Sequence, residues 1–328
     1  MADPHVLVTF RPSRVVRGAL DQAFHGVAGV TYLADVEAAT RREAIGSADA
    51  VLAWNLGREL EDPGELTQLG AARLVQLLSA GVDEVPLNRI PADVPVASNA
   101  GAYAGPMAEH VLAMALALAK HLPQRHAALE SGIFDQSANR EIRGAVVCVL
   151  GFGGIGRASA RLFEALGARI RAVTRSPVEE QWVEWAGPVD DLETGLSGAD
   201  IVVVSLPLTR ATRGLVGARE LSFMKPDAIL INVARGPIID EDALYRHLGE
   251  HPAFQAGLDV WWDEPRSGEP FAPRLPFLHL PNVLGSPHNS GITETSLAEA
   301  ARRAAANVVR VLDGSPPEHL VDRREYGD

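Results

Sequence analysis

The stretch GAVVCVLGFGGIGRASARLFEALGARI, residues 144–170, decides the fold of this chain. It begins with an apolar run rich in β-branched residues, which is typical of a buried strand, and residues 157–166 repeat their apolar positions at helical spacing. Between the two, Gly151, Gly153 and Gly156 form a GxGxxG turn. In such a strand–turn–helix unit, the glycines permit the tight turn, let a pyrophosphate approach the backbone and allow the helix to pack closely. The stretch therefore predicts a dinucleotide-binding unit.

Strand-like runs alternate with helical stretches on both sides of this turn. Before it, the strand-like runs are residues 6–10, 50–54, 74–78 and 94–98, and the helical stretches are 14–24 and 63–72. From residue 144 onward, the runs are 144–150, 168–174, 199–206, 228–233, 256–260 and 282–284. This alternation is typical of parallel α/β sheets. We therefore expect an α/β fold with two doubly wound parallel sheets, the second larger than the first, and a last helix, 294–312, that crosses back to the first.

The end of the strand at 168–174 indicates which dinucleotide is bound. An NAD enzyme normally carries Asp or Glu there, about 20 residues after the glycines, to bind the ribose 2′-hydroxyl. This chain has Thr174, Arg175 and Ser176 instead. Arg175 can pair with a 2′-phosphate and Ser176 can donate a hydrogen bond to it, so NADP(H) is favoured and NAD(H) is the alternative cofactor. A different role for Arg175, stacking on the adenine, stays open.

Three polar residues follow the later strand-like runs. Arg235, Glu264 and His288 are spaced 29 and 24 residues apart and lie in the signatures VARGPIIDEDAL, LDVWWDEP and GSPHNSG. Open α/β sheets bind ligands at the carboxyl ends of their strands, so we expect these three side chains to converge on a bound nicotinamide.

The three residue types suit hydride transfer to the carbonyl of a 2-keto acid. Such a reaction needs a cation for the developing oxyanion, a proton donor and a group that stabilises the charged donor. The Arg235 guanidinium can bind carbonyl and carboxylate oxygens together, the His288 imidazole can donate the proton, and the Glu264 carboxylate can stabilise the imidazolium. Each residue alone is also typical of a structural role, but together they predict an oxidoreductase.

Composition sets the broad class. The 328 residues are 47% hydrophobic and suffice for two domains, and the net charge of −12 argues against nucleic acid or an anionic membrane as a partner. The apolar helix expected at 107–122 is too short to cross a bilayer, and residues 1–10 lack the features of a signal peptide, so we expect a cytoplasmic protein. The single cysteine, Cys148, excludes an internal disulfide and is expected in the core. We predict no metal site.

The chain resembles the D-isomer-specific 2-hydroxyacid dehydrogenases over nearly its whole length. The motifs that carry the resemblance are GFGGIGRASARLFEALGARI, ADIVVVSLPLTRATRGLVG, AILINVARGPIIDEDAL, GLDVWWDEP and GSPHNSG. The resemblance implies that Arg235, Glu264 and His288 are catalytic and that Asp259 holds the nicotinamide carboxamide. It also implies that residues 79–83 form the substrate loop, where the amides of Gly81 and Val82 bind the substrate carboxylate.

The same resemblance implies a domain organisation. Two Rossmann-like domains would hold the active site in the cleft between them, with residues 1–98 plus 290–328 forming the flavodoxin-like substrate domain and 99–289 the dinucleotide domain. Homodimers are usual in such families. The Arg175–Ser176 pair is similar to that of the NADPH-preferring glyoxylate and hydroxypyruvate reductases, which favours reduction of a small 2-keto acid.

The motifs and the resemblance together predict which residues contact the substrate and the cofactor. For the substrate, they come from Trp54, Ala80, Gly81, Val82, Arg235 and His288. For the cofactor, they come from Gly151, Gly153, Gly154, Ile155, Thr174, Arg175, Ser176, Leu206, Pro207, Thr212, Val233, Ala234, Asp259, His288 and Ser290. Four aromatic residues could line or crowd the pocket, namely Trp54, Tyr103, Trp261 and Trp262, and the pair Trp54–Asn55 is preferred.

Three alternatives stay open. A bulkier or unusual 2-hydroxy acid could replace the small one, because an aromatic side chain can stack on a phenyl ring. The substrate could be an amino acid or a hydroxy acid phosphate. Some proteins that share this fold resemble corepressors that sense dinucleotides without turnover.

Overall fold

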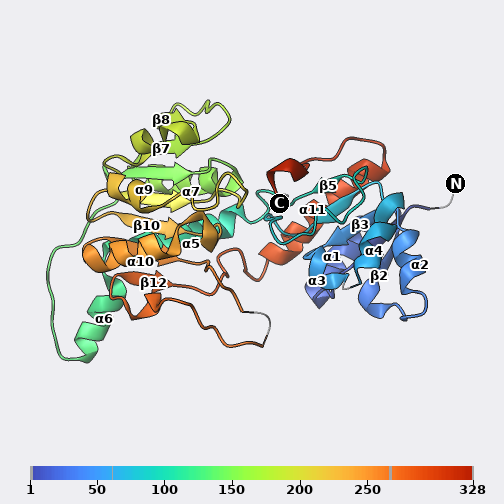
Figure 1. Cartoon of the computed structure of the whole chain (residues 1–328), viewed down its shortest axis with the longest axis horizontal. Coiled ribbons are helices and arrows are strands. Elements are labelled where there is room, and N and C mark those ends of the chain that lie inside the picture. Colours follow the sequence, from blue (N-terminus) through green and yellow to red (C-terminus); the bar gives the residue numbers. More distant parts are fainter. Residues whose placement is uncertain (1–2, 61, 266–267, 327–328) are drawn as a thin grey trace. The chain divides into compact units, whose positions relative to one another are not determined.

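The chain divides into two compact units (Figure 1). The computed structural model describes residues 3–60, 62–265 and 268–326. One unit comprises Met1–Tyr103 and Ile292–Asp328, and the other comprises Ala104–Gly291. The boundary after Tyr103 has a local cause, because residues just before it are bonded to the first unit. The Tyr103 hydroxyl donates to the Leu78 oxygen at 2.9 Å. Asn99 Nδ2 donates to the Ala300 oxygen at 2.9 Å.

The first unit contains a five-stranded parallel sheet in the order β2-β1-β3-β4-β5. The strands are β1 (His5–Val8), β2 (Gly29–Tyr32), β3 (Ala50–Ala53), β4 (Val75–Leu77) and β5 (Val96–Ala97). The helices are α1 (Arg14–Phe24), α2 (Arg41–Gly46), α3 (Leu56–Glu59), α4 (Pro63–Thr67) and α11 (Ser296–Leu312), with 3-10 turns at Leu33–Asp35, Gln68–Ala71 and Arg323–Glu325. The helix expected at 63–72 is thus divided between α4 and a 3-10 turn.

The last helix belongs to this first unit, as its sequence position predicted. Asn307 on α11 donates through Nδ2 to Gln76 Oε1 on β4 at 2.7 Å, and both side chains are buried. A buried amide must find partners, so this bond and the apolar face of α11 hold the helix against the sheet.

The second unit contains a seven-stranded parallel sheet in the order β12-β11-β10-β9-β6-β7-β8. The strands are β6 (Val146–Leu150), β7 (Arg169–Val173), β8 (Val183–Gly187), β9 (Ile201–Val204), β10 (Ile229–Asn232), β11 (Gln255–Leu258) and β12 (Val283–Gly285). The helices are α5 (Ala104–Ala119), α6 (Leu122–Glu130), α7 (Gly154–Ala165), α8 (Leu192–Leu196), α9 (Ala218–Phe223) and α10 (Glu241–Glu250), with 3-10 turns at Val189–Asp191, Gly236–Ile238 and Phe277–His279.

The alternation of side chains along β6 explains why this sheet is covered on both faces. Cys148 and Leu150 belong to one apolar cluster, together with residues of α8, α9 and α10, whereas Val147 and Val149 belong to another, together with residues of α5 and α7. Successive side chains of a strand point to opposite faces, so a fully buried strand requires helices on both sides. Cys148 is a buried free thiol within the first of these clusters.

The apolar helix expected at 107–122 differs from the observed one. It begins earlier, at Ala104, and ends at Ala119, because His121 has a left-handed backbone with φ of 51°. Pro123 lies in the first turn of α6, where its missing N–H costs no hydrogen bond. Among the described residues, no helix has the length and apolar character needed to cross a membrane.

Candidate active site

The glycine turn at the end of β6 has the geometry that its spacing predicts. Gly151 has φ of +95°, and a Cβ there would lie 2.8 Å from the Leu206 nitrogen. A Cβ on Gly156 would lie 2.0 Å from the Gly151 oxygen, so only glycine allows α7 to approach the turn so closely. By contrast, a Cβ on Gly153 would meet nothing within 4 Å.

The N-terminus of α7 is suited to an anionic group. The helix begins at Gly154 after Gly153, its N-cap makes no side-chain hydrogen bond, and no acidic residue occupies its first turn. The first N–H groups of a helix lack intrahelical acceptors and carry partial positive charge. Together with the open space at Gly153, they fit the pyrophosphate of a dinucleotide.

The segment after β7 is held by its backbone and leaves two side chains exposed. The Thr174 N–H donates to the Gly187 oxygen at 2.9 Å, and the Ser176 N–H donates to Thr174 Oγ1 at 3.2 Å. Arg175 and Ser176 are exposed. No carboxylate belongs to the three residues that follow this strand, as the sequence already indicated.

The loop after β9 is closed by one of the expected cofactor residues. Thr212 is buried, and its hydroxyl donates to the Pro207 oxygen at 2.6 Å and accepts from the Thr209 N–H at 2.8 Å. Because the single hydroxyl hydrogen is used inside the loop, the structure gives Thr212 a loop-closing role. Leu206 is half-buried, and Pro207 is exposed.

Arg235 follows β10 in a turn that is held from both sides. The buried Asn232 accepts from the Ala234 N–H at 3.0 Å and donates to the Arg235 oxygen at 2.9 Å. After it, a Cβ on Gly236 would lie 2.3 Å from the main-chain carbon of Trp261, so the turn packs directly on the backbone that leads to Glu264. Val233 and Ala234 are buried beneath.

The side chains of Glu264 and His288 form a close hydrogen-bonded pair. His288 Nδ1 lies 2.6 Å from Glu264 Oε2, and the other carboxylate oxygen accepts from the Trp261 N–H at 3.1 Å. The two side chains are 38% and 32% exposed, so the pair is neither buried nor fully solvated.

The charges of two other expected catalytic residues affect the pKa of Glu264. Burial raises the pKa of Glu264, whereas its hydrogen bond to His288 and the charge of that imidazole lower it. The Trp261 N–H and the charge of Arg235 lower it further, and the resulting pKa lies below the ordinary value. Within the second unit, both His288 and Arg235 therefore act on the Glu264 carboxylate.

His288 has a left-handed backbone, with φ of 51°. Its N–H donates to the main-chain oxygen of Asp259 at 2.7 Å. The Asp259 side chain is fully buried and accepts from the Asn289 N–H and the Ser290 N–H, both at 3.2 Å. Asp259, expected only to hold the cofactor, therefore also holds the loop that carries His288. The Ser290 hydroxyl is buried without a hydrogen-bond partner among the described residues.

The expected substrate loop lies in the first unit, after β4. Ser79 Oγ donates to the Gly81 oxygen at 2.8 Å and contacts the Trp54 oxygen at 3.3 Å. Ala80 and Gly81 are half-buried and Val82 is buried.

The comparisons with known proteins place the chain in a family. Residues 112–290 match the NAD binding domain of the D-isomer specific 2-hydroxyacid dehydrogenases, which is more than half of the chain. The chain belongs to the D-isomer specific 2-hydroxyacid dehydrogenase family. The α/β fold expected from the sequence is confirmed, since solved structures with this description share it.

Two curated relatives and one solved structure describe the similarity. A D-3-phosphoglycerate dehydrogenase of Methanocaldococcus jannaschii is 33% identical over 66% of this chain and 41% of its own length. A glyoxylate reductase of Thermococcus gammatolerans is 36% identical over 56% of this chain and 53% of its own length. The match thus spans about half the length of these relatives. A D-isomer specific 2-hydroxyacid dehydrogenase from Xanthobacter autotrophicus Py2, solved in complex with NADPH and MES, has a TM-score of 0.81 at 29% identity and covers 99% of this chain and 100% of its own.

In this family member, three of the four aromatic residues are bonded within their own unit. The Trp261 indole donates to the Ser286 oxygen at 3.0 Å, and the Trp262 indole donates to the Ile239 oxygen at 2.7 Å. The Tyr103 hydroxyl is used as described above. Trp54 is the exception, since the residue is 36% exposed and its ring meets that of Phe10 edge-on, with centroids 6.1 Å apart.

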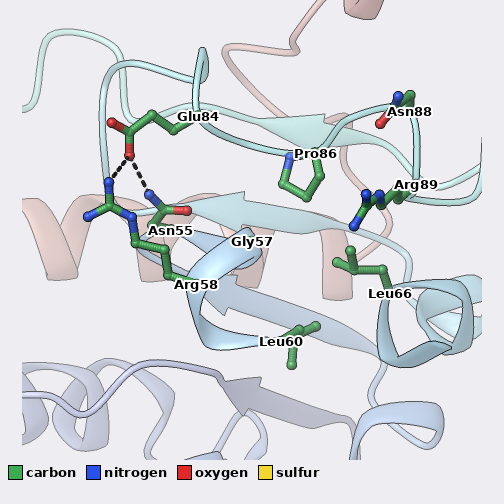
Figure 2. A pocket seen from close by; sticks show the side chains of 9 residues that line it. All are labelled: Asn55, Gly57, Arg58, Leu60, Leu66, Glu84, Pro86, Asn88 and Arg89. Carbon is green, nitrogen blue, oxygen red and sulfur yellow. Dashed lines mark hydrogen bonds and ion pairs between the residues drawn. The ribbon is translucent and has the colours of Figure 1, made fainter. Parts of the chain in front are cut away.

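Asn55, the neighbour of Trp54 in the pair preferred for substrate contact, uses its side chain inside the first unit. Figure 2 shows it beside a pocket of about 440 Å³ in the first unit, where its Nδ2 donates to Glu84 Oε2 at 2.6 Å. The Arg58 guanidinium donates to the same oxygen at 3.0 Å. The amide of Asn55 is thus used to hold the loop after β4.

Sequence reasoning missed four residues that support the expected site residues, three in the second unit and one in the first. They are Asn232, which holds the Arg235 turn; Glu59, which accepts the Trp54 and Asn55 amides; Ser286; and His110. The only available signal was polarity in an apolar setting, as for Asn232 at the end of the run AILIN and His110 inside an apolar helix.

Within the described part of the chain, no group of three or more His, Cys, Asp or Glu side chains is arranged to hold a metal ion.

Proposed function

We propose that this protein reduces a small 2-keto acid of the glyoxylate or hydroxypyruvate kind to the D-2-hydroxy acid, with NADPH as the preferred cofactor. The observation that carries the proposal is the 2.6 Å pair between His288 Nδ1 and Glu264 Oε2, in the same unit as a glycine turn suited to a dinucleotide. The proposal rests further on the family to which the chain belongs.

The proton inventory of the pair assigns a role to each nitrogen of His288. Because the pKa of Glu264 is lowered, its carboxylate is ionised near neutral pH and can only accept a hydrogen bond. Nδ1 of His288 must therefore carry a hydrogen, and Nε2 is the nitrogen that delivers the catalytic proton to the carbonyl oxygen. Glu264 keeps its negative charge beside the imidazolium and orients the ring.

The cofactor supplies the hydride that reaches the carbonyl carbon when it is bound. The Arg235 guanidinium then stabilises the negative charge that develops on the carbonyl oxygen, until His288 transfers the proton there. We assign the substrate carboxylate to the amides of Gly81 and Val82, and Ala80 and Trp54 to contacts with the rest of the substrate. The bonds within the loop, from Ser79 to Gly81, support a fixed backbone for that role.

The preference for NADP(H) rests on the end of β7. Arg175 and Ser176 are both exposed there, and a 2′-phosphate would meet a guanidinium, a hydroxyl and no carboxylate from this turn. The solved relative that was crystallised with NADPH supports this preference. With Arg175 stacked on adenine instead, NAD(H) would serve equally well.

The remaining cofactor contacts follow the family pattern. Pyrophosphate would lie at Gly153, Gly154 and Ile155, and the Asp259 carboxylate would add a bond to the carboxamide beside those it already accepts. Leu206, Pro207, Val233 and Ala234 would line the nicotinamide, and the unpartnered Ser290 hydroxyl would offer it a hydrogen bond.

We further propose a homodimer built on α6. This helix has no buried residue, and in Figure 1 it extends outward from its own unit, with its first half bonded to the segment before β12 through Gln124 Nε2 and the Pro281 oxygen at 2.6 Å. Four large apolar side chains at its ends and just after it are more than half exposed, namely Leu122, Leu129, Ile133 and Phe134. A helix with so little buried surface gains little stability from its own unit, so a second copy of the chain is the partner we infer.

The test is to follow the absorbance of NADPH and of NADH while the purified protein meets glyoxylate, hydroxypyruvate, pyruvate, 2-ketobutyrate, 2-ketoisovalerate and phenylpyruvate. We expect oxidation of NADPH with glyoxylate or hydroxypyruvate. Preference for phenylpyruvate would replace the small substrate with a bulky one, and tight cofactor binding without any turnover would support a dinucleotide-sensing role instead. A cytoplasmic location stays a prediction.

A further inference from the structure

We propose that His110 is a positioning residue for the loop 286–290, acting on His288 through Ser286 and Asp259. The inference rests on the proposed function, because it assigns His288 the proton transfer. His110 lies on α5, 178 residues before His288 in the chain, and no sequence motif links the two.

Asp259 is the centre of the arrangement. Its carboxylate has no exposed surface, and three groups of the loop donate to it: the Ser286 hydroxyl at 2.5 Å and the amides of Asn289 and Ser290 at 3.2 Å. A buried carboxylate is costly unless its oxygens are satisfied, so these bonds hold the loop to the strand end.

His110 completes the bonding of Ser286. Its Nε2 lies 3.0 Å from Ser286 Oγ and 3.7 Å from Asp259 Oδ1. The serine hydroxyl has one hydrogen, and Asp259 receives it. The bond between His110 and Ser286 can therefore run in one direction only, from Nε2–H to the oxygen, which requires the hydrogen of His110 to be on Nε2.

The loop needs such support because of the backbone of His288. A side chain other than glycine pays a conformational cost at φ of 51°, and this geometry persists only when its surroundings hold it. The N–H of His288 donates to the main-chain oxygen of Asp259. Both the main-chain oxygen and the side-chain carboxylate of Asp259 therefore hold the loop. His110 fixes the hydroxyl that approaches Asp259 most closely and thereby fixes the position from which His288 meets Glu264.

Two substitutions of His110 separate the hydrogen bond from packing. In His110→Gln the amide Nε2 can still donate to Ser286, whereas His110→Leu keeps much of the volume and donates nothing. Glu109→Gln, at the exposed neighbouring position of the same helix, is the control. We expect His110→Leu to lower kcat on the order of tenfold, the size expected for one lost partly buried hydrogen bond, and His110→Gln to stay within about threefold of the natural protein.

The coupling with Ser286 is the sharper readout. Ser286→Ala should lower kcat by a similar factor, and the double variant with His110→Leu should be no slower than the worse single variant, since both remove one shared bond. KM for the 2-keto acid should change less than kcat. Multiplied effects in the double variant, or equal losses in His110→Leu and His110→Gln, would overturn the proposal.

One measurement stays informative if the chain turns out to reduce no 2-keto acid. The ring nitrogens of His288 can be followed by NMR, with the signal assigned by its absence in His288→Asn. We expect the hydrogen-bonded Nδ1–H signal to be kept in His110→Gln and broadened or shifted in His110→Leu. An unchanged signal in His110→Leu contradicts the positioning role, whereas absent turnover with a changed signal contradicts only the proposed function.

Discussion

The side chains of Glu264 and His288 meet at 2.6 Å although their backbones belong to different loops, after β11 and after β12. Neighbouring parallel strands bring both loops to one edge of the sheet. The second carboxylate oxygen of Glu264 is held by the Trp261 N–H, which fixes the direction from which the carboxylate meets the imidazole.

Glu264→Gln tests the charge of this pair through stability. The pKa of Glu264 is lowered in the folded protein, so its stabilising contribution is complete above the unfolded value of about 4.3 and is lost as the pH falls through the lower folded value. We expect the variant to unfold at a lower temperature than the natural protein at pH 7. The difference should shrink in acid, as followed by calorimetry across this range. A difference that stays constant down to pH 3 would mean that the carboxylate charge is not responsible.

The glycine turn offers a matched pair of substitutions. Gly156→Ala places a methyl group against the main-chain oxygen of Gly151, so it should destabilise the protein by about 1–3 kcal/mol or more. Gly153→Ala meets no neighbour, so its unfolding free energy should stay within about 0.5 kcal/mol.

Gly153→Ala, which should leave stability unchanged, is expected to weaken cofactor binding instead. In Gly153→Ala the methyl group occupies the space expected for the pyrophosphate, and we expect NADPH to bind on the order of tenfold more weakly in a fold of unchanged stability. Fluorescence titration of NADPH measures this. Unchanged affinity in Gly153→Ala would remove the pyrophosphate from this turn.

Arg175→Ala tests the reading of the cofactor 2′-phosphate. We expect kcat/KM for NADPH to fall on the order of tenfold or more while that for NADH changes little, because only the phosphate loses a charge-assisted bond. Arg219→Ala, an exposed arginine on α9 in a surface ion pair, is the control. Equal losses with both cofactors would assign Arg175 to adenine stacking.

The proposed dimer predicts a change of mass. Leu129→Glu together with Phe134→Ser places polar groups on the exposed apolar surface at α6, and we expect the particle mass by light scattering to fall from two chains to one. Arg42→Ser, at an exposed position in the first unit, is the control. Natural protein that already has the mass of one chain would contradict the dimer.

Much of the fold followed from local patterns, and the exceptions have physical reasons. The apolar run 144–150 and the glycines after it allowed β6 and α7 to be predicted, because burial and close approach leave few residue choices there. β2 (GVTY) and β8 (VEWAG) were missed, since they are short edge strands with partly exposed residues and no continuous apolar run.

Site residues that directly follow strands could be predicted from the sequence. Hydrogen bonds between segments far apart in the chain could not. Arg235, Glu264 and His288 could be placed because strand ends converge at one edge. The bond from Ser286 to Asp259, and the approach of His110, join segments far apart in the chain, and no periodicity reports such contacts. The end of α5 at Ala119 was also hidden, because it depends on the left-handed backbone of His121.

The most direct measurement is the oxidation of NADPH with glyoxylate or hydroxypyruvate by the natural protein and by His288→Ala, with cofactor affinity measured in parallel. Loss of the proton donor should lower kcat by a factor on the order of 100 or more and leave NADPH binding nearly intact. Turnover of His288→Ala equal to that of the natural protein would contradict the account.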